Sequence, residues 1–170
     1  MPDLIIRKAV PQDAPAIYEI MTSAVRNLQK RDWFLDDDLD FIQRHINSSE
    51  GYTLVCTADG KTAGFLIIRR PGLEKFNLGY HLGLSDEELL NTAHIESSAV
   101  LPTYRGLGIM KKLLSEAVEL ETKNGTRYLM VTVHPDNLYS VNNLKAVGFK
   151  LHSTQKKYGD WVRSIMYQEI

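Results

Sequence analysis

The chain has 170 residues, of which 44% are hydrophobic and 24% are charged, and its net charge is −1. This composition is typical of one folded domain and excludes a disordered chain, which would be poorer in apolar residues. The balanced charge gives no electrostatic argument for nucleic acid or a membrane as a partner. We therefore expect a single domain over residues 1–170.

The cysteine content and the N-terminus bear on the compartment. Cys56 is the only cysteine, so no intramolecular disulfide is expected, which suits the cytoplasm. It lies in an alternating apolar run, which predicts a small core residue rather than a nucleophile. The first residues lack the pattern of a signal peptide, and no apolar run approaches the roughly 20 residues that span a bilayer.

Hydrophobic periodicity divides the first half of the chain into strands and amphipathic helices. Asp13 follows a proline turn and is the expected N-cap of the first helix. Asp59-Gly60 between two alternating runs is a strong hairpin signal. The expected elements are a strand at 4–10, helices at 14–28 and 38–47, and strands at 52–58 and 62–69.

The second half begins with a long connection at 71–91, of a length often used for lids and binding loops. A helical turn is expected within it at 85–90. The elements expected after it are a strand at 94–101, a helix at 109–123, a strand at 128–133, a helix from 137 to Gly148, and a hairpin of strands at 150–157 and 161–169. This order predicts an α/β fold whose mixed sheet is antiparallel at first and then contains a parallel βαβ step.

The segment from Val100 to Lys111 reads as a strand, a glycine-containing loop and a helix. Glycines let the backbone approach a ligand closely, and the first amides of a helix attract anions. Arg105 adds a positive charge. The sequence therefore predicts a phosphate site, although an ordinary helix start is an alternative. Neither the P-loop nor the dinucleotide fingerprint is present.

The run Pro-Thr-Tyr-Arg-Gly-Leu-Gly-Ile at 102–109 resembles the acetyl-CoA signature of the GNAT family of N-acetyltransferases. Arg105 and Gly108 match that signature, whereas Met110 stands where the family usually has Gly or Ala. A second resemblance lies in Asn137 and Ser140, followed by Asn143 and Gly148-Phe149. Asn137 also fits a simple helix cap. The two motifs occur in the family's order, so the resemblance covers nearly the whole chain.

The resemblance implies a GNAT fold and acetyl-CoA as the cosubstrate. The pantetheine arm would lie between the strands at 94–101 and 128–134. The cofactor-binding residues that it implies are Ser98, Val100, Arg105, Gly106, Leu107, Gly108, Ile109, Met110, Asn137, Ser140 and Asn143. No metal is implied. Relatives often dimerise, so a homodimer is possible for this chain.

Direct attack by an amine needs a base, because an ammonium group cannot attack a thioester. Glu96 is the first candidate, in a strand where the family often places its base; its alternatives are a solvent-facing side chain and a structural ion pair. His94 is a second candidate, with a structural role as its alternative. Leu144 occupies the place of the family's usual tyrosine acid, so Tyr139 is a weaker candidate for proton donation, against ordinary packing.

These observations predict an N-acetyltransferase that acts on a primary amine of a small molecule or peptide. A non-catalytic acyl-CoA-binding module is the alternative. The acidic run at 36–38 is expected to be a solvated helix start or a feature that attracts a cationic acceptor. Trp33, Phe34 and Tyr80 lie in loops that approach the acceptor site in relatives, and each has packing as its alternative. His134 is expected to be structural, with contact to the cofactor as its alternative.

Overall fold

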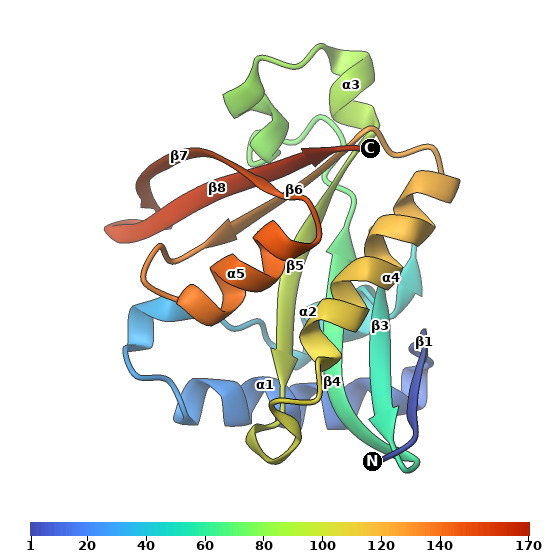
Figure 1. Ribbon diagram of the computed structural model, residues 1–170. Helices are drawn as coiled ribbons and strands as arrows, with labels where there is room; N and C mark the ends of the chain where they lie inside the picture. Colours follow the sequence, from blue (N-terminus) through green and yellow to red (C-terminus); the bar gives the residue numbers. More distant parts are fainter.

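A computed structural model describes residues 1–170 and places one twisted sheet between two layers of helices (Figure 1). The strands are β1 Leu4–Lys8, β2 Asn47–Ser48, β3 Gly51–Ala58, β4 Lys61–Arg69, β5 Thr92–Val100, β6 Tyr128–Val133, β7 Lys150–Lys157 and β8 Trp161–Glu169. The helices are α1 Ala14–Arg26, α2 Leu39–Arg44, α3 Asp86–Leu90, α4 Ile109–Lys123 and α5 Leu138–Ala146. Short 3-10 turns are η1 Pro11–Asp13, η2 Arg31–Trp33, η3 Leu78–Leu82 and η4 Pro102–Tyr104.

The sheet has the strand order β1-β3-β4-β5-β6-β8-β7, with β2 paired to β3. Every pair is antiparallel except β5 and β6, which α4 connects as a parallel βαβ step. The predicted mixed α/β sheet is thereby confirmed. The connection is as expected, because parallel neighbours need a crossover that is usually a helix.

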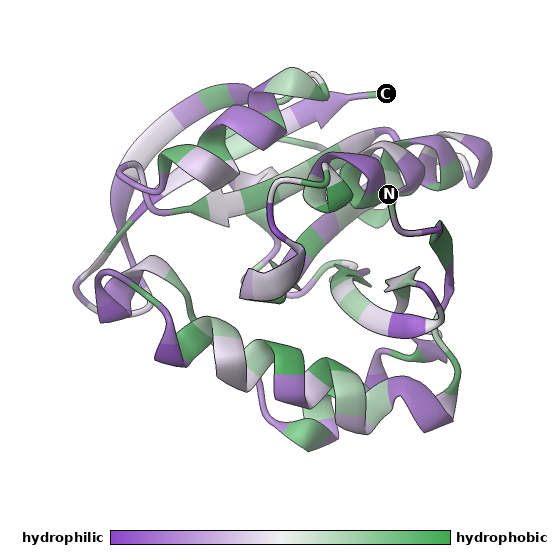
Figure 2. Cartoon of the chain, turned by 60° about the horizontal axis from the view of Figure 1, so that its bottom comes forward, coloured by the Kyte–Doolittle hydropathy of each residue, from purple (hydrophilic) through white to green (hydrophobic).

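The helices cover opposite faces of the sheet and bury two separate cores. α4 and α5 pack on one face, where Leu113 and Leu144 belong to a cluster of 21 buried residues. α1 and α2 pack on the other face, where Ile17 and Ile42 belong to a cluster of 11. Apolar and polar residues alternate around these helices in Figure 2, as expected for elements that are half buried. Cys56 is fully buried in the first cluster, which confirms the core prediction.

The first half differs from the prediction in some bounds, since β1 ends at Lys8 rather than Val10 and α2 ends at Arg44 rather than Asn47, and in two further details. Asp13 does not cap α1 with its side chain. Its carboxylate instead accepts two hydrogen bonds from Arg7, at 2.7 and 2.9 Å, because β1 runs directly beside the turn. The two-residue strand β2 was also not predicted, since so short a run has no periodicity to detect. No helix combines the length and the apolar character needed to cross a membrane.

Candidate active site

The sheet splits where β5 and β6 separate. The two strands pair only at the start of each, with His94 opposite Met130 as the last pair. Beyond this point β5 stays paired to β4 as far as Val100, and β6 stays paired to β8 as far as Val133. The facing edges therefore carry backbone N–H and C=O groups that have no strand partner, and such groups can bind an extended ligand as an added strand would.

A cleft of about 850 Å³, partly open to solvent, lies at this split. Its walls come from β5, β6, the first turns of α4 and α5, the segment before α2 and the β7–β8 hairpin. The residues that line it are Trp33, Phe34, Leu35, Asp37, Ile95, Glu96, Ser97, Ser98, Met110, Leu114, Val131, Thr132, Val133, Asn137, Ser140, Leu144, Tyr158 and Arg163.

A β-bulge in β5 directs Glu96 into this cleft. Ile67 and Ile68 of β4 are paired with Ser97 and Ile95, so Glu96 is the extra residue of the bulge. The bulge also reverses the alternation of side chains along β5: Ile95 belongs to the core under α4, and so does Val100 five residues later. Bulges re-aim side chains in this way and are common beside active sites.

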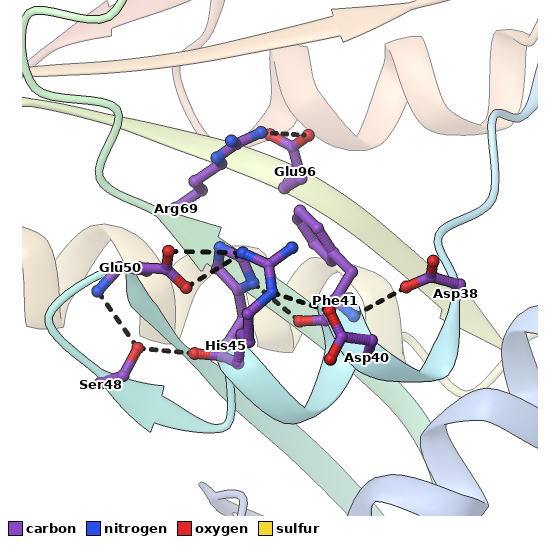
Figure 3. A network of polar contacts seen from close by, with 9 residues as sticks. Asp38, Asp40, Phe41, His45, Ser48, Glu50, Arg69 and Glu96 are labelled. Atoms are coloured by element: carbon purple, nitrogen blue, oxygen red, sulfur yellow. Dashed lines mark hydrogen bonds and ion pairs between the residues drawn. The ribbon is translucent and has the colours of Figure 1, made fainter.

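The Glu96 carboxylate is enclosed by polar groups from three elements. It lies 3.5 Å from the Arg69 guanidinium and 4.0 Å from His94 Nδ1. Figure 3 shows the Arg69 side chain extending to it from β4. Burial raises the pKa of Glu96 although Arg69 opposes this, and Asp37 raises it further. Glu96 therefore binds a proton more readily than an exposed glutamate does.

His94 lies beside Glu96, but one of its ring nitrogens already accepts a hydrogen bond from the backbone. Its Nε2 accepts from the backbone N–H of Leu78 at 3.1 Å, so the proton of the neutral ring is on Nδ1, facing Glu96. Burial lowers the pKa of His94 to about 3. At neutral pH the ring is uncharged and has no free nitrogen lone pair. This geometry favours Glu96 over His94 as the base and gives His94 a positioning role.

The glycine loop has the geometry expected of a phosphate site. Gly106 and Gly108 have φ values of +83° and +74°, the left-handed region that glycine adopts without strain. Gly108 is the N-cap of α4, and the first bond of the helix runs from the Lys112 N–H to the Gly108 carbonyl. The amides of residues 109–111 therefore have no acceptor within the helix.

Two side chains at this loop point in different directions. Met110 is 6% exposed and packs into the core and the cleft wall, so it does not cover the helix start. Its backbone amide is left free. Arg105 precedes the two glycines and is exposed, and Leu107 lies between them.

On α5 the structure brings two of the predicted residues to the cleft. Asn137 and Ser140 line it, and Asn137 also caps the helix by accepting from the Ser140 N–H at 3.4 Å. Asn143 instead donates to the Tyr139 carbonyl, and Tyr139 is 50% exposed outside the cleft. The position of Tyr139 therefore does not support proton donation to a ligand in the cleft.

The polar residues that line the cleft but that the sequence did not indicate as site residues are Ser97, Thr132, Tyr158 and Arg163. Tyr158 enters from the turn after β7, and its hydroxyl lies 3.3 Å from Thr132 Oγ1. Burial raises its pKa, which keeps the hydroxyl protonated at neutral pH. Arg163 comes from β8. Arg69 of β4 was also not indicated; it does not line the cleft but contacts Glu96. The pattern of Tyr158-Gly159 between two strands indicated only a hairpin, because spacing does not show which way a turn folds.

The loops predicted near the acceptor site divide into two groups. Trp33 and Phe34 line the cleft, but Tyr80 is outside it and donates to the Leu73 carbonyl. No residue of the 71–91 connection lines the cleft. This connection contacts two residues that surround Glu96. The backbone N–H of Leu78 donates to His94, and the Phe76 ring lies 4.2 Å from the Arg69 guanidinium.

The acidic run before α2 has three separate roles. Asp38 caps α2 through the Phe41 N–H, and Asp36 pairs with Arg31. Asp37 lines the cleft, where it accepts a hydrogen bond of 2.7 Å from Ser97 and burial raises its pKa. His134 stacks on Trp33 with a centroid distance of 6.0 Å, so its position fits the expected structural role. No cluster of His, Cys, Asp or Glu is arranged to hold a metal ion.

Comparison with known proteins identifies the family. A model of the acetyltransferase (GNAT) family matches residues 15–149. The chain belongs to the GNAT acetyltransferase family. As a GNAT member it is an acyltransferase, and acetyl-CoA is its cosubstrate. The glycine loop and the split between β5 and β6 are where the resemblance in sequence placed the cofactor.

Solved GNAT structures share the fold at low identity. The ribosomal-protein-S18-alanine N-acetyltransferase from Escherichia coli is 20% identical with a TM-score of 0.74, over 99% of this chain and 94% of that one. A phosphinothricin acetyltransferase from Sinorhizobium meliloti, in complex with acetyl-CoA, is 22% identical with a TM-score of 0.74, over 98% and 88%. An N-acetyltransferase from Staphylococcus aureus is 19% identical with a TM-score of 0.74, over 98% of both chains.

Proposed function

We propose that this GNAT protein moves the acetyl group of acetyl-CoA to a primary amine of a small molecule or peptide by direct attack, with residues 1–170 as one catalytic domain. The observation that carries the proposal is the position of Glu96. The bulge turns this carboxylate into the open part of the split sheet, and burial raises its pKa.

The acceptor enters the cleft as an ammonium ion, which Glu96 and Asp37 attract. Glu96 takes one proton, directly or through a water molecule, and leaves the amine lone pair free. The nitrogen then attacks the carbonyl carbon of the thioester. A backbone N–H on the unpaired edge of β5 stabilises the negative charge that develops on the carbonyl oxygen.

The nitrogen gives up its second proton to bulk water, the carbon–sulfur bond breaks, and the neutral amide forms as CoA leaves as a thiolate. A thiol has a pKa of about 8.5, so the thiolate leaves without strong acid catalysis. We assign Tyr158 to hydrogen bonding with the leaving sulfur, because its protonated hydroxyl is in the cleft and Leu144 offers no donor. Attack is direct because Cys56, the only cysteine, is buried in the core away from the cleft and burial raises its pKa.

The test is an initial-rate study with acetyl-CoA, a panel of primary amines and a free-thiol readout. Direct attack predicts thiol release that depends on the amine and gives intersecting double-reciprocal lines. Parallel lines would indicate an acetylated enzyme and would contradict direct attack. Tight binding of acetyl-CoA without release in the presence of any amine would support the non-catalytic binding module instead.

A further inference from the structure

Two hydrogen-bond donors in the cleft wall have no acceptor. Arg163 is 3% exposed, and its Nη1 donates to the backbone carbonyls of Asp32 and Val162, at 2.6 and 2.8 Å. Its Nη2 has no partner. The indole Nε1 of Trp33 is likewise buried without a partner. Both side chains line the cleft, and both come from outside the two cofactor motifs.

The unpaired donor on Arg163 is costly because it belongs to a charged group. A guanidinium stays charged in proteins, and burying a charge is unfavourable unless a partner compensates it. Nη1 is satisfied by neutral carbonyls, and the carboxylate of Asp32 is 3.5 Å from His134 Nε2. The Nη1 bonds account for a structural role in holding η2. They do not explain why Nη2 is buried without a hydrogen-bond partner.

The cleft carries both acidic groups and unpaired donors. The carboxylates of Glu96 and Asp37 come from β5 and the segment before α2, whereas the unpaired donors come from β8 and η2. A ligand that carries only amines would satisfy the carboxylates and leave Arg163 and Trp33 unpaired. A ligand with an amine at one end and an anion at the other would satisfy both sets.

We propose, on the basis of the acetyl transfer proposed above, that the acceptor is a small amino acid-like molecule whose carboxylate binds Arg163 Nη2 and Trp33 Nε1. Arginine forms strong charge-assisted hydrogen bonds with a carboxylate, and the indole N–H adds a second donor. The carboxylate anchors one end of the molecule while Glu96 receives the proton from the amine at the other.

Pairs of amines that differ only in the carboxylate provide the test. Suitable pairs are lysine and cadaverine, histidine and histamine, and tyrosine and tyramine, with the remaining common amino acids screened beside them. The expected result is a kcat/KM on the order of 10- to 100-fold higher for the carboxylate-bearing member of a pair that reacts. Equal values, or a preference for the decarboxylated amine, would overturn the proposal.

Two variants test whether Arg163 and Trp33 cause the preference for a carboxylate-bearing acceptor. Arg163→Gln removes the positive charge. Trp33→Phe removes the indole N–H but keeps an aromatic ring, so it tests the same site if Arg163→Gln folds poorly. Each is expected to lower kcat/KM for the amino acid at least about fivefold while changing that for the matching amine much less. Arg127→Gln, at the exposed start of β6, is the control and is expected to change neither. A preference that both variants retain would contradict the assignment.

Calorimetric binding of the same amino acids to the CoA complex separates this proposal from the acetyl transfer. Binding that Arg163→Gln weakens, without turnover, would support the anion site and count against the proposed reaction. Turnover of plain amines without any carboxylate preference would support the reaction and overturn the anion site. Absence of amino acid binding to the wild-type complex would also overturn it.

Discussion

Desolvation opposes the charged form of two neighbouring residues in β5 and gives them different roles. It lowers the pKa of His94 to about 3 and raises that of Glu96. The histidine is therefore neutral under ordinary conditions, and its Nε2 lone pair is taken by the Leu78 amide. Glu96 has no such bond to its backbone surroundings and faces the cleft. Burial and hydrogen bonding together favour Glu96 over His94 as the proposed base.

The low pKa of His94 predicts a pH-dependent contribution to stability. An unfolded histidine has a pKa of about 6.5, so the unfolded chain binds this proton first as the pH falls. The folded state consequently loses stability between about pH 6.5 and 3. His94→Gln has no histidine at this position and does not lose this part of the stability as the pH falls. The free energy of unfolding of the wild type is therefore expected to fall by roughly 1–2 kcal/mol relative to that of the variant from pH 7 to pH 5.

Urea unfolding at the two pH values measures this difference. His152→Gln replaces an exposed histidine on β7 and serves as the control. A difference between wild type and His94→Gln that is the same at pH 7 and pH 5 would show that the histidine is not held neutral by burial.

Sequence reasoning found the candidate bases and several other lining residues of the cleft, but it missed some of the polar side chains at the site. Glu96 and His94 were visible as polar residues in a strand of recognisable position. Tyr158 comes from the β7–β8 turn, Arg163 from β8 and Arg69 from β4, and only the sheet order and the hairpin twist bring them to the split. Tyr139 was selected for its nearness in sequence to Asn137, but it lies on the exposed side of α5.

At the scale of elements, the loop before α4 depends on two left-handed glycines. A side chain at Gly108 would meet no atom within 4 Å, so substitution is opposed by the backbone conformation alone. Gly108→Ala is expected to cost about 1–2 kcal/mol in the bound conformation, which lowers acetyl-CoA affinity roughly 5- to 30-fold. Isothermal titration with acetyl-CoA measures the effect.

Gly60 provides a matched control for that experiment. It lies in the β3–β4 turn with a φ of +79° and also has no atom within 4 Å of an added Cβ. Gly60→Ala carries similar backbone strain but is outside the cofactor loop. It is expected to lower the melting temperature and leave acetyl-CoA affinity unchanged. Equal affinities for the two variants would argue against a role for the Gly108 conformation in binding.

Most elements follow from local sequence, whereas the feature that forms the site does not. The bounds of α4, β6, β7 and β8 agree with the prediction to the residue, because helical periodicity, glycine stops and the hairpin turn are local signals. The bulge at Glu96 has no such signal. The bulge is defined by how β5 pairs with β4. A strand predicted from its own residues is assumed to alternate strictly, so the extra residue cannot be detected.

At the scale of the whole molecule, the sheet is joined across its centre by only a short parallel pairing. Acetyl-CoA bound in the split would contact β5 on one side and β6 and α5 on the other, so it would tie the two halves together. At about 100 times the dissociation constant, a ligand that binds only the folded state adds roughly 2.7 kcal/mol. For a domain of this size, this corresponds to a rise in melting temperature of about 5–10 °C.

A thermal unfolding scan with acetyl-CoA tests this stabilisation, and adenosine diphosphate serves as the control for its pyrophosphate part. We expect a larger shift with acetyl-CoA, because only the complete cofactor reaches the split. Equal shifts with the two ligands would mean that the pantetheine arm does not lie between the strands.

The most direct measurement of the central claim is the kcat of Glu96→Gln with an amine that the wild type acetylates, together with its acetyl-CoA dissociation constant. Glutamine keeps the shape of the side chain but cannot take a proton. We predict a fall in kcat of about 10²- to 10⁴-fold with an unchanged dissociation constant and melting temperature. A kcat within about threefold of wild type would contradict the account, because another group would then remove the proton from the acceptor amine.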